Sequence, residues 1–433
     1  MTGQSRRIAI VGGGIAGMAC SWELRKPSAQ NVTVDIYESE NKLGGHANSV
    51  PFRGNGTTVD VDTGFIVMDE ATYPRFNAFL GELGIRTIPT DMSFAVTTTD
   101  RSFEWSSRSV FSFIATLTLL LSPWLWRLMF DIIRFSLFAE DILHEQRSPR
   151  REKYAAHTAQ TGGNASDAEE TRIVSTSLES IGAYLTRQGY SRNEVLISFL
   201  DGTQKTFDHV VLAVHANQAA TLLGDDVTAL ERKILGGFKT SRNTCYLHSD
   251  TSLLPRRLSA RAAWNCTLAP HTPTAAQDHV KQNEGNHGRK LSLTFDMNRL
   301  QEIPRPGEPG SPGRVLVSMN PVRAPRSVQS SHVYCHPIIN SECILMARHL
   351  HKINGIRRVG FAGAWMGFGF HEDGFAAGVH AARTFMDGWD KTPPLDLIGD
   401  GEGIQPPRNG FLRASLRFWV RAVQRLLQPQ PWP

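Results

Sequence analysis

Three glycines near the amino terminus have the spacing of a phosphate-binding turn. Gly12, Gly14 and Gly17 form a G-x-G-x-x-G pattern directly after the apolar run Arg7–Val11. A buried strand, a glycine turn and a helix with free N–H groups together hold the pyrophosphate of a dinucleotide. Gly12 permits the tight turn, Gly14 lets the pyrophosphate approach, and Gly17 lets the helix pack on the strand. The predicted contacts are Gly12, Gly14, Ile15, Ala16 and Gly17.

A carboxylate follows where the ribose of a dinucleotide would need one. The apolar run Val32–Tyr37 ends in Glu38, 21 residues after Gly17. An acid at this place accepts hydrogen bonds from both ribose hydroxyls, in NAD and in FAD alike. The next residues favour FAD, because Gly44 and Gly45 indicate a second close passage of backbone along the cofactor.

Several blocks resemble the flavin amine-oxidase and phytoene-desaturase superfamily, in particular a subgroup of predicted NAD/FAD-binding oxidoreductases. They are the second glycine motif after Lys42 and the segments 59–67 (VDVDTGFIV), 207–216 (FDHVVLAVHA) and 361–374 (FAGAWMGFGFHEDG). The resemblance spans about residues 6–385 and implies FAD as the cofactor. The further cofactor contacts that we predict are Lys42, Gly44, Gly45, His46, Thr63, Gly64, Gly363 and Gly374.

The resemblance is interrupted in the middle of the chain. In the subgroup, an aromatic-rich block and a Gly-Gly motif follow the helix that corresponds to Leu178–Tyr190. Here Ser191 and Arg192 lead directly into Asn193–Leu196. Either the protein lacks part of its substrate domain, or the coding sequence as read omits it. Both alternatives put catalytic turnover in doubt, although the FAD-contacting ends are kept.

The motif order predicts an α/β fold class. The resemblance implies a Rossmann-like FAD-binding domain, with a parallel sheet and an antiparallel β-meander, plus a discontinuous α+β substrate domain. At 433 residues, two or three packed units are expected. The expected segments are 1–90 (FAD domain, first part), 91–192 (helical substrate or membrane-facing region with polar linker 145–175), 193–235 (return hairpin), 236–354 (substrate domain), 355–390 (FAD domain, last part) and 391–433 (linker and basic tail).

Candidate catalytic residues follow the last glycine-rich turn. We predict that His371 and Glu372 handle protons beside the flavin, whose N5 accepts the hydride. Asp373 could instead cap a helix predicted over 375–386. Tyr334 and His336 are further candidates for the lining of the pocket.

Composition excludes several other classes. The net charge of +5 is small, and residues 411–433 carry four Arg and no acid, so nucleic-acid binding is not expected. No G-x-S-x-G, H-E-x-x-H or P-loop pattern supports a hydrolase or a kinase. Five cysteines without a C-x-x-C pair favour neither a disulfide framework nor a metal site, and no secretory leader is expected. A cytoplasmic, reducing compartment is therefore predicted, with membrane association as an addition.

Two segments could touch a membrane. Residues 109–126 contain no charge, and 18 residues is the lower limit for a spanning helix. A buried or tunnel-lining helix is the favoured interpretation, with a membrane-dipping or spanning helix as alternatives. The tail 411–427 predicts a basic amphipathic helix, which suits an anionic membrane surface or the protein's own body. Its arginines recur every four residues, at Arg413, Arg417, Arg421 and Arg425.

These observations together predict an FAD-dependent oxidoreductase. It would oxidise or desaturate an apolar small molecule, lipid-like, polyketide or terpenoid, by hydride transfer to flavin N5. Two alternatives remain: a flavin amine oxidase, and a non-catalytic, flavin-binding, membrane-associated protein.

Overall fold

The computed structural model describes residues 6–26, 32–108, 195–199, 201–268 and 291–387, with scattered positions between 123 and 138, at 395 and between 415 and 420. The chain forms two compact units. The first comprises Met1–Ser112 with Arg192–Glu402, and the second Phe113–Ser191 with Gly403–Pro433. The predicted linker 145–175 and helix 178–190 lie outside the described residues, as do most of 109–126 and of the tail.

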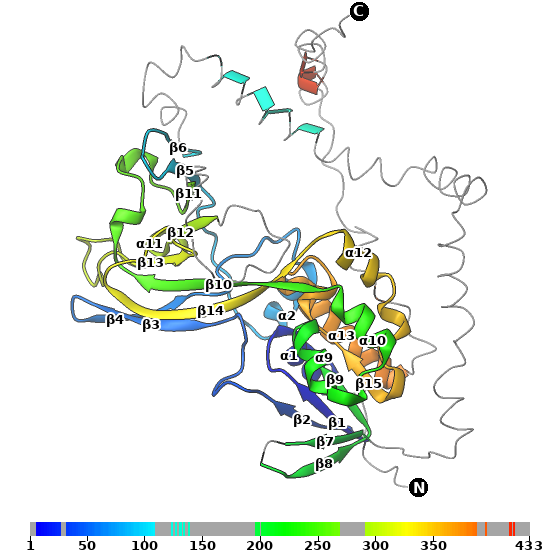
Figure 1. Cartoon of the computed structure of the whole chain (residues 1–433). Helices are drawn as coiled ribbons and strands as arrows, with labels where there is room; N and C mark the ends of the chain where they lie inside the picture. Colours follow the sequence, from blue (N-terminus) through cyan, green and yellow to red (C-terminus); the bar gives the residue numbers. More distant parts are fainter. Residues whose placement is uncertain are drawn as a thin grey trace, which may run out of the picture. The chain divides into compact units, whose positions relative to one another are not determined.

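A four-stranded parallel sheet organises one part of the first unit (Figure 1). Its strand order is β15-β9-β1-β2, and every neighbouring pair is parallel. The strands are β1 (Arg6–Val11), β2 (Val32–Tyr37), β9 (His209–Leu212) and β15 (Val359–Phe361). Segments from three distant parts of the sequence therefore lie side by side, as the return strand and the last glycine-rich block predict. The predicted α/β fold class is confirmed.

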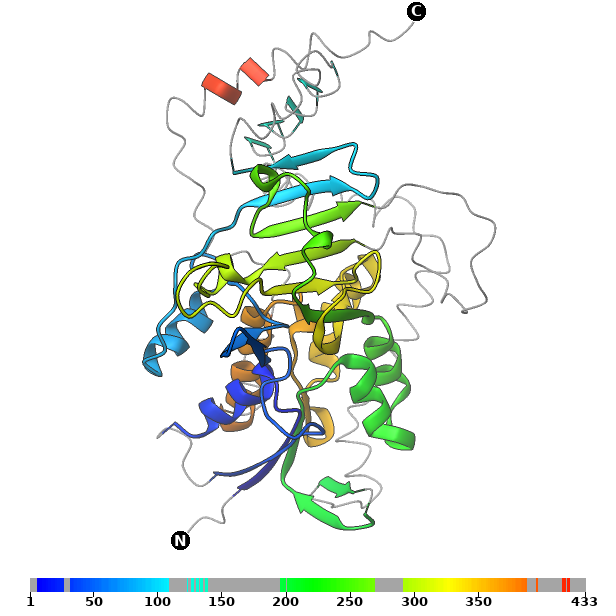
Figure 2. The ribbon, with the colours of Figure 1, turned by 90° about the vertical axis from the view of Figure 1, so that its left-hand side faces the viewer.

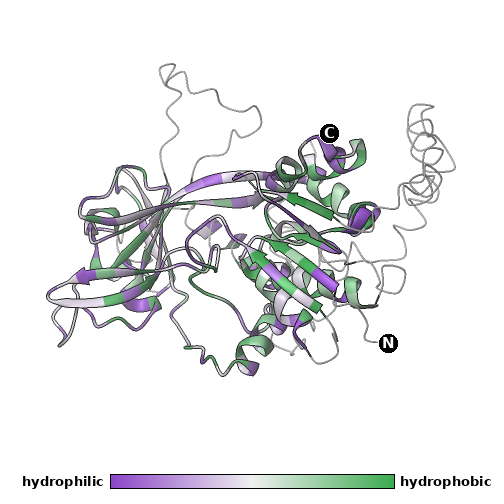
Figure 3. Ribbon diagram, turned by 90° about the horizontal axis from the view of Figure 1, so that it is seen from below, coloured by the Kyte–Doolittle hydropathy of each residue, from purple (hydrophilic) through white to green (hydrophobic). Residues whose placement is uncertain are grey.

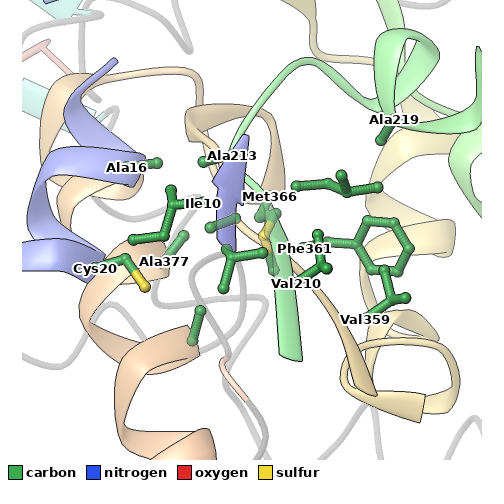
Figure 4. Packing of buried hydrophobic residues seen from close by; sticks show 14 of the residues in the cluster. Ile10, Ala16, Cys20, Val210, Ala213, Ala219, Val359, Phe361, Met366 and Ala377 are labelled. Carbon is green, nitrogen blue, oxygen red and sulfur yellow. The ribbon is translucent and has the colours of Figure 1, made fainter. Parts of the chain in front are cut away.

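Helices α1 (Ile15–Leu24) and α13 (His371–Asp387) pack against each other beside this sheet. Close backbone approach requires glycine here, because a Cβ on Gly378 would lie 2.1 Å from the Ala16 carbonyl oxygen. An ion pair between the buried Glu23 and the exposed Arg383 also joins the helices, with Arg383 Nε 2.8 Å from Glu23 Oε1. Figure 4 shows part of the core that results, in which Ile10 of β1 lies beside Ala16 and Cys20 of α1 and Ala377 of α13.

A seven-stranded sheet forms the other part of this unit (Figure 2). Its order is β14-β10-β13-β12-β11-β5-β6, antiparallel except for the parallel pair β11–β5. The strands are β5 (Phe94–Thr98), β6 (Glu104–Ser106), β10 (Lys239–His248), β11 (Trp264–Leu268), β12 (Ser292–Asp296), β13 (Leu316–Met319) and β14 (Val328–Ile338). Strands β5 and β6 correct the expected helical region 91–192, because alternating burial along 94–98 fits a strand.

The long strands β10 and β14 carry more polar residues than the strands of the parallel sheet. They pair from Lys239 opposite Ile338 to His248 opposite Val328, with an irregularity near the end. Figure 3 shows mostly hydrophobic colour on the parallel strands and hydrophilic colour along much of the β10–β14 pair. Polar side chains on this pair are thus available for a site.

Two hairpins complete the strands of the first unit. β3 (Ser49–Gly54) pairs with β4 (Thr57–Asp62), and its Phe52 and Val61 share a core with Leu247 and Val317 of the large sheet. β7 (Val195–Ser198) pairs with β8 (Gln204–Phe207) around Gly202, whose φ of 81° suits the predicted Asp-Gly turn. In the described residues, this two-stranded hairpin is the antiparallel component that precedes β9.

The remaining helices of this unit are short. The α-helices are α2 (Pro74–Glu82), α9 (Ala216–Leu223), α10 (Ala229–Gly236), α11 (Met297–Leu300) and α12 (Ser341–Ala347). The 3-10 turns are η1 (Gly224–Asp226), η2 (Thr251–Leu253), η3 (Leu258–Ala260), η4 (Leu350–Lys352), η5 (Ile356–Arg358) and η6 (Ala364–Met366). A capping box starts α10, in which the Glu231 carboxylate accepts from the Thr228 N–H at 2.8 Å.

The second unit is described at few positions. Arg417 of the basic tail donates from Nε to the Leu137 carbonyl oxygen at 3.0 Å, and its guanidinium lies 5.0 Å from the centre of the Phe138 ring. The tail therefore contacts the segment that follows the apolar stretch. Among the residues that the structure describes, no helix combines the length and the hydropathy needed to cross a bilayer.

Candidate functional site

The first glycine turn has the geometry that the motif predicts. Gly12 has a φ of 108°, and its N–H donates to the Tyr37 carbonyl oxygen at 2.8 Å. A Cβ on Gly12 would lie 2.3 Å from the Ala213 oxygen, and one on Gly17 would lie 1.9 Å from the Gly12 oxygen. Both positions therefore need glycine because backbone fills the space where a side chain would begin.

The space beside Gly14 is different. Its backbone is extended (φ −73°, ψ −175°), and a Cβ there would meet no atom closer than Gly45 Cα at 3.9 Å. Among the described residues, no acidic group lies in the first turn of α1 and no side chain caps it. The N–H groups of Ile15 and Ala16 therefore offer an anion the positive end of a ten-residue helix.

Glu38 lies directly beside this turn. Its Oε2 accepts from the Gly13 N–H at 2.8 Å, and its Oε1 accepts from the Glu40 N–H at 3.0 Å. Partial burial alone would raise the pKa of Glu38, but these hydrogen bonds outweigh burial and lower its pKa below the usual value. Glu38 is thus held as a carboxylate. Its Oε1 also accepts from the Ser39 hydroxyl at 3.1 Å, so Oε2 is the oxygen that keeps a lone pair for a ribose hydroxyl.

The two glycine motifs are in contact. The Gly44 N–H donates to the Gly13 carbonyl oxygen at 2.9 Å, and a Cβ on Gly45 would lie 3.1 Å from Gly14 Cα. Gly44 and Gly45 both have positive φ, 129° and 56°. Lys42, by contrast, is exposed and donates to the Ser49 carbonyl oxygen at 3.3 Å.

The segment after Gly45 runs beside the predicted residues Thr63 and Gly64. A Cβ on Gly64 would lie 2.2 Å from the His46 carbonyl oxygen, so this approach also requires glycine. The buried Thr63 hydroxyl donates to the Asn48 carbonyl oxygen at 2.9 Å and lies 2.7 Å from the Tyr334 hydroxyl. Thr63 and Tyr334, far apart in sequence, are therefore joined in one hydrogen-bonded group.

Four half-buried histidines gather at this place, and we call them the histidine cluster: His46, His215, His336 and His371. The His46 ring centre lies 6.0 Å from that of His215 and 5.2 Å from that of His336. Burial, helped by the neighbouring His336, His215 and His371, lowers the pKa of His46 to about 3. Burial also lowers the pKa of His371 to about 4. These imidazoles are therefore neutral at pH 7.

The structure adds to the cluster a residue that sequence reasoning passed over. His215 was not among the predicted site residues, although it stands in the return block 207–216, just beyond the carboxyl end of the parallel strand β9. That end of a parallel strand is where α/β folds place functional groups, which was the available signal. His371 packs on Phe65, with stacked ring centres 3.9 Å apart.

Glu372 and Asp373 are engaged in capping. Glu372 accepts from the backbone N–H groups of Arg75 and Phe76 at 3.2 and 2.9 Å, at the start of α2. Asp373 accepts from the Phe370 N–H at 2.8 Å, and burial raises its pKa to about 6. The helix begins at His371, earlier than predicted, so Asp373 stands within its first turn instead of before it.

Gly363 and Gly374 are explained by packing between protein segments. A Cβ on Gly363 would lie 2.3 Å from Trp365 Nε1, and one on Gly374 would lie 2.8 Å from Ile15 Cγ2. Gly374 therefore lets α13 approach the first turn of α1. This contact links the last predicted block to the glycine turn of the first.

Comparison with known proteins supports this geometry. Residues 10–83 match a family described as an NAD(P)-binding Rossmann-like domain. This part of the chain is similar to Rossmann-like dinucleotide-binding domains. It contains both glycine motifs, Glu38, Thr63 and Gly64.

The chain also resembles individual proteins over longer stretches. It is 29% identical over 153 residues to prenylcysteine oxidase 1 of Mus musculus, and 28% identical to that of Rattus norvegicus. Each match covers 35% of this chain and 27% of the relative, so the chain matches about a quarter of the curated relatives' length. A CLA-producing fatty acid isomerase from P. acnes has a similar fold, with a TM-score of 0.51 at 13% identity, over 88% of this chain and 98% of that chain.

Glu38→Gln is expected to weaken dinucleotide binding by about 1–3 kcal/mol, because the side chain can no longer accept a charge-assisted hydrogen bond from a ribose hydroxyl. The amide oxygen can still accept from Gly13, but the NH₂ group loses the bond from the Glu40 N–H, so the unfolding midpoint is measured alongside. The measurement is the flavin dissociation constant by fluorescence quenching. An unchanged constant would show that Glu38 serves only the turn.

Proposed function

We propose that the chain is an FAD-dependent oxidoreductase. The observation that carries this proposal is the contact between the two glycine motifs, which frames an open helix N-terminus beside the Glu38 carboxylate. A dinucleotide pyrophosphate fits the first turn of α1, because Gly14 is the one glycine of this turn whose Cβ position has no neighbour closer than 3.9 Å. The names of the curated relatives, which are oxidases, support an oxidation.

The residues present fit the roles that FAD requires. The N–H groups of Ile15 and Ala16 would bind the pyrophosphate, and Glu38 would bind the ribose. When bound, the flavin accepts a hydride at N5. The histidine cluster would hold protons without adding positive charge, since its members are neutral at pH 7. Glu372 acts in this proposal by fixing α2 against the start of α13.

Gly14→Val provides the sharpest test of the proposal. A Cβ at Gly14 would have one neighbour within 4 Å, Gly45 Cα at 3.9 Å, so the unfolding midpoint should stay nearly unchanged. The pyrophosphate would lose its approach, and we expect flavin content to fall from about one per chain to almost none. Absorbance of the purified protein measures it. Stoichiometric flavin in a folded Gly14→Val variant contradicts the assignment.

The substrate that we propose is an apolar, lipid-like molecule. Phe368 and Phe370, directly before His371, are 48% and 57% exposed, which offers apolar contact area beside the cluster. The relatives named above act on prenylcysteine or on a fatty acid, and both compounds carry long hydrocarbon chains. Oxidation or desaturation of such a chain is consistent with the neutral imidazoles of the histidine cluster.

We also propose contact of the tail with anionic membranes. Leu416 and Trp419 are 49% and 68% exposed, while Val420 is buried, so the described part of the tail presents apolar surface although Arg417 contacts Leu137.

Deleting residues 411–433 should release the protein from anionic vesicles, since each arginine contributes about 1 kcal/mol to membrane binding. Sedimentation with and without high salt measures this, and bound flavin should stay constant. Continued sedimentation of the truncated protein would assign the contact to residues 109–126 instead.

A further inference from the structure

A chain of hydrogen bonds leads from the backbone to one member of the histidine cluster. The Thr244 N–H donates to Asn320 Oδ1 at 3.1 Å. Asn320 Nδ2 donates to Asn243 Oδ1 at 2.7 Å. Asn243 Nδ2 lies 2.7 Å from His336 Nδ1. These residues come from β10, from the residue after β13, and from β14.

The direction of every bond in this chain is fixed by its first member. A backbone N–H can only donate, so the Asn320 atom that meets Thr244 is the oxygen and its amide nitrogen faces Asn243. Asn243 must then present its oxygen to Asn320 and its NH₂ group to His336. A second anchor agrees, because the same Asn243 Nδ2 lies 3.2 Å from the Ser241 carbonyl oxygen, which can only accept.

His336 Nδ1 must therefore be an acceptor, and the ring proton resides on Nε2. Among the described residues, no group forms a hydrogen bond with Nε2 of His336. This nitrogen is also not one of the fully buried, unpartnered polar atoms. It remains accessible to a ligand. Neither Asn243 nor Asn320 was singled out by its sequence pattern.

We propose that Asn320 and Asn243 are positioning residues that hold His336 as a neutral Nε2–H donor, and that His336 donates this hydrogen bond to a carbonyl or carboxylate oxygen on an apolar substrate. The part that concerns the ligand rests on the proposed function. The part that concerns the tautomer is a property of the folded chain alone.

The surroundings of His336 favour an acceptor ligand. The groups that face it are His46 on the loop after β2, His215 at the start of α9, and Asn243 on β10. His371 on α13 joins them through His46, and Tyr334 on β14 is satisfied by Thr63 and Asn48. Among the described residues, no carboxylate pairs with these rings, so their N–H groups are left for oxygens of a ligand.

The tautomer can be measured in the full chain labelled with ¹⁵N-histidine. Long-range ¹H–¹⁵N spectra distinguish Nε2–H, Nδ1–H and doubly protonated rings, and His336→Gln identifies the signals of His336. His248 is an internal reference, because its Nδ1 accepts from the Asp250 N–H at 3.0 Å and it must also be Nε2–H. We expect both rings in the Nε2–H form at pH 7. A His336 ring found as Nδ1–H or as a cation overturns the proposal.

Asn243→Asp tests the role of the network. A carboxylate cannot donate to Nδ1, so His336 should become protonated there, and its pKa should rise by about 1–3 units. Gln204→Glu, on the exposed β8 hairpin, adds the same charge as a matched control and should leave His336 unchanged. An unshifted His336 in a folded Asn243→Asp protein would overturn the positioning role. Should that variant fail to fold, the wild-type spectrum still decides the tautomer.

The ligand is tested with octanoate as the probe. Octanoate should shift the Nε2 signal of His336 and leave that of His248 in place, and His336→Phe should bind it more weakly than His336→Gln, whose amide can donate. No shift at His336 overturns the assignment of the ligand. Bound flavin is measured in the same samples, so a protein without flavin that shows the expected tautomer and shift would contradict the proposed function and not this inference.

Discussion

Gly17→Ala is expected to destabilise the folded protein by about 3 kcal/mol or more, because it disturbs the packing of α1 on the parallel sheet, and to abolish flavin retention. The added methyl group would lie 1.9 Å from the Gly12 carbonyl oxygen and 3.2 Å from Ile10 Cγ2. Backbone of the turn cannot move away, because Gly12 is itself tied to Tyr37. The measurement is the free energy of unfolding in urea, with flavin content alongside.

Gly81→Ala is the matched control for this variant. It also places a methyl group in a helix, α2, but meets nothing within 4 Å. Alanine has a higher helix propensity than glycine, so this variant should raise the free energy of unfolding by up to about 1 kcal/mol. Equal effects of the two substitutions would show that α1 can shift away from β1, contrary to the packing described.

Acidification from pH 7 to pH 4 is expected to lower the free energy of unfolding by several kcal/mol. Burial lowers the pKa of His248, His209 and His371 to about 4 in the folded protein. Between about pH 6.5 and pH 4 the unfolded chain therefore binds protons that the folded protein does not, so stability falls as pH falls. For the fully buried His248, this difference corresponds to about 3 kcal/mol.

His248→Gln separates the loss of stability caused by histidine protonation from the loss caused by carboxylate protonation. The variant should be less stable than wild type at pH 7, because the hydrogen bond from Asp250 is disturbed, but its stability should fall less steeply between pH 6.5 and pH 4. Hydrogen bonds outweigh burial and lower the pKa of Asp250, so the stability that its carboxylate provides is lost only at pH values below about 4. Urea unfolding at several pH values measures both slopes. Parallel curves for variant and wild type would refute the role of His248.

The sequence by itself determined the dinucleotide turn and much of the fold around it. Gly12, Gly17 and Glu38 could be assigned because each requirement is local: a positive φ, a close backbone contact, or an acid at the end of a strand. The β7–β8 hairpin was predictable for the same reason, since an Asp-Gly pair selects its own turn. The return strand β9 was predictable from its continuous apolar run.

Only the tertiary structure decided what lies around that turn. Glu372 was predicted as catalytic, yet its carboxylate caps α2, a partner almost 300 residues away that no local pattern indicates. The histidine cluster assembles residues from a loop, two helix starts and a strand, and the tautomer of His336 depends on Asn320 across two strands. Local spacing fixes backbone conformation within a few residues. The protonation and pairing of a side chain depend on whichever distant groups the packed sheets bring to it.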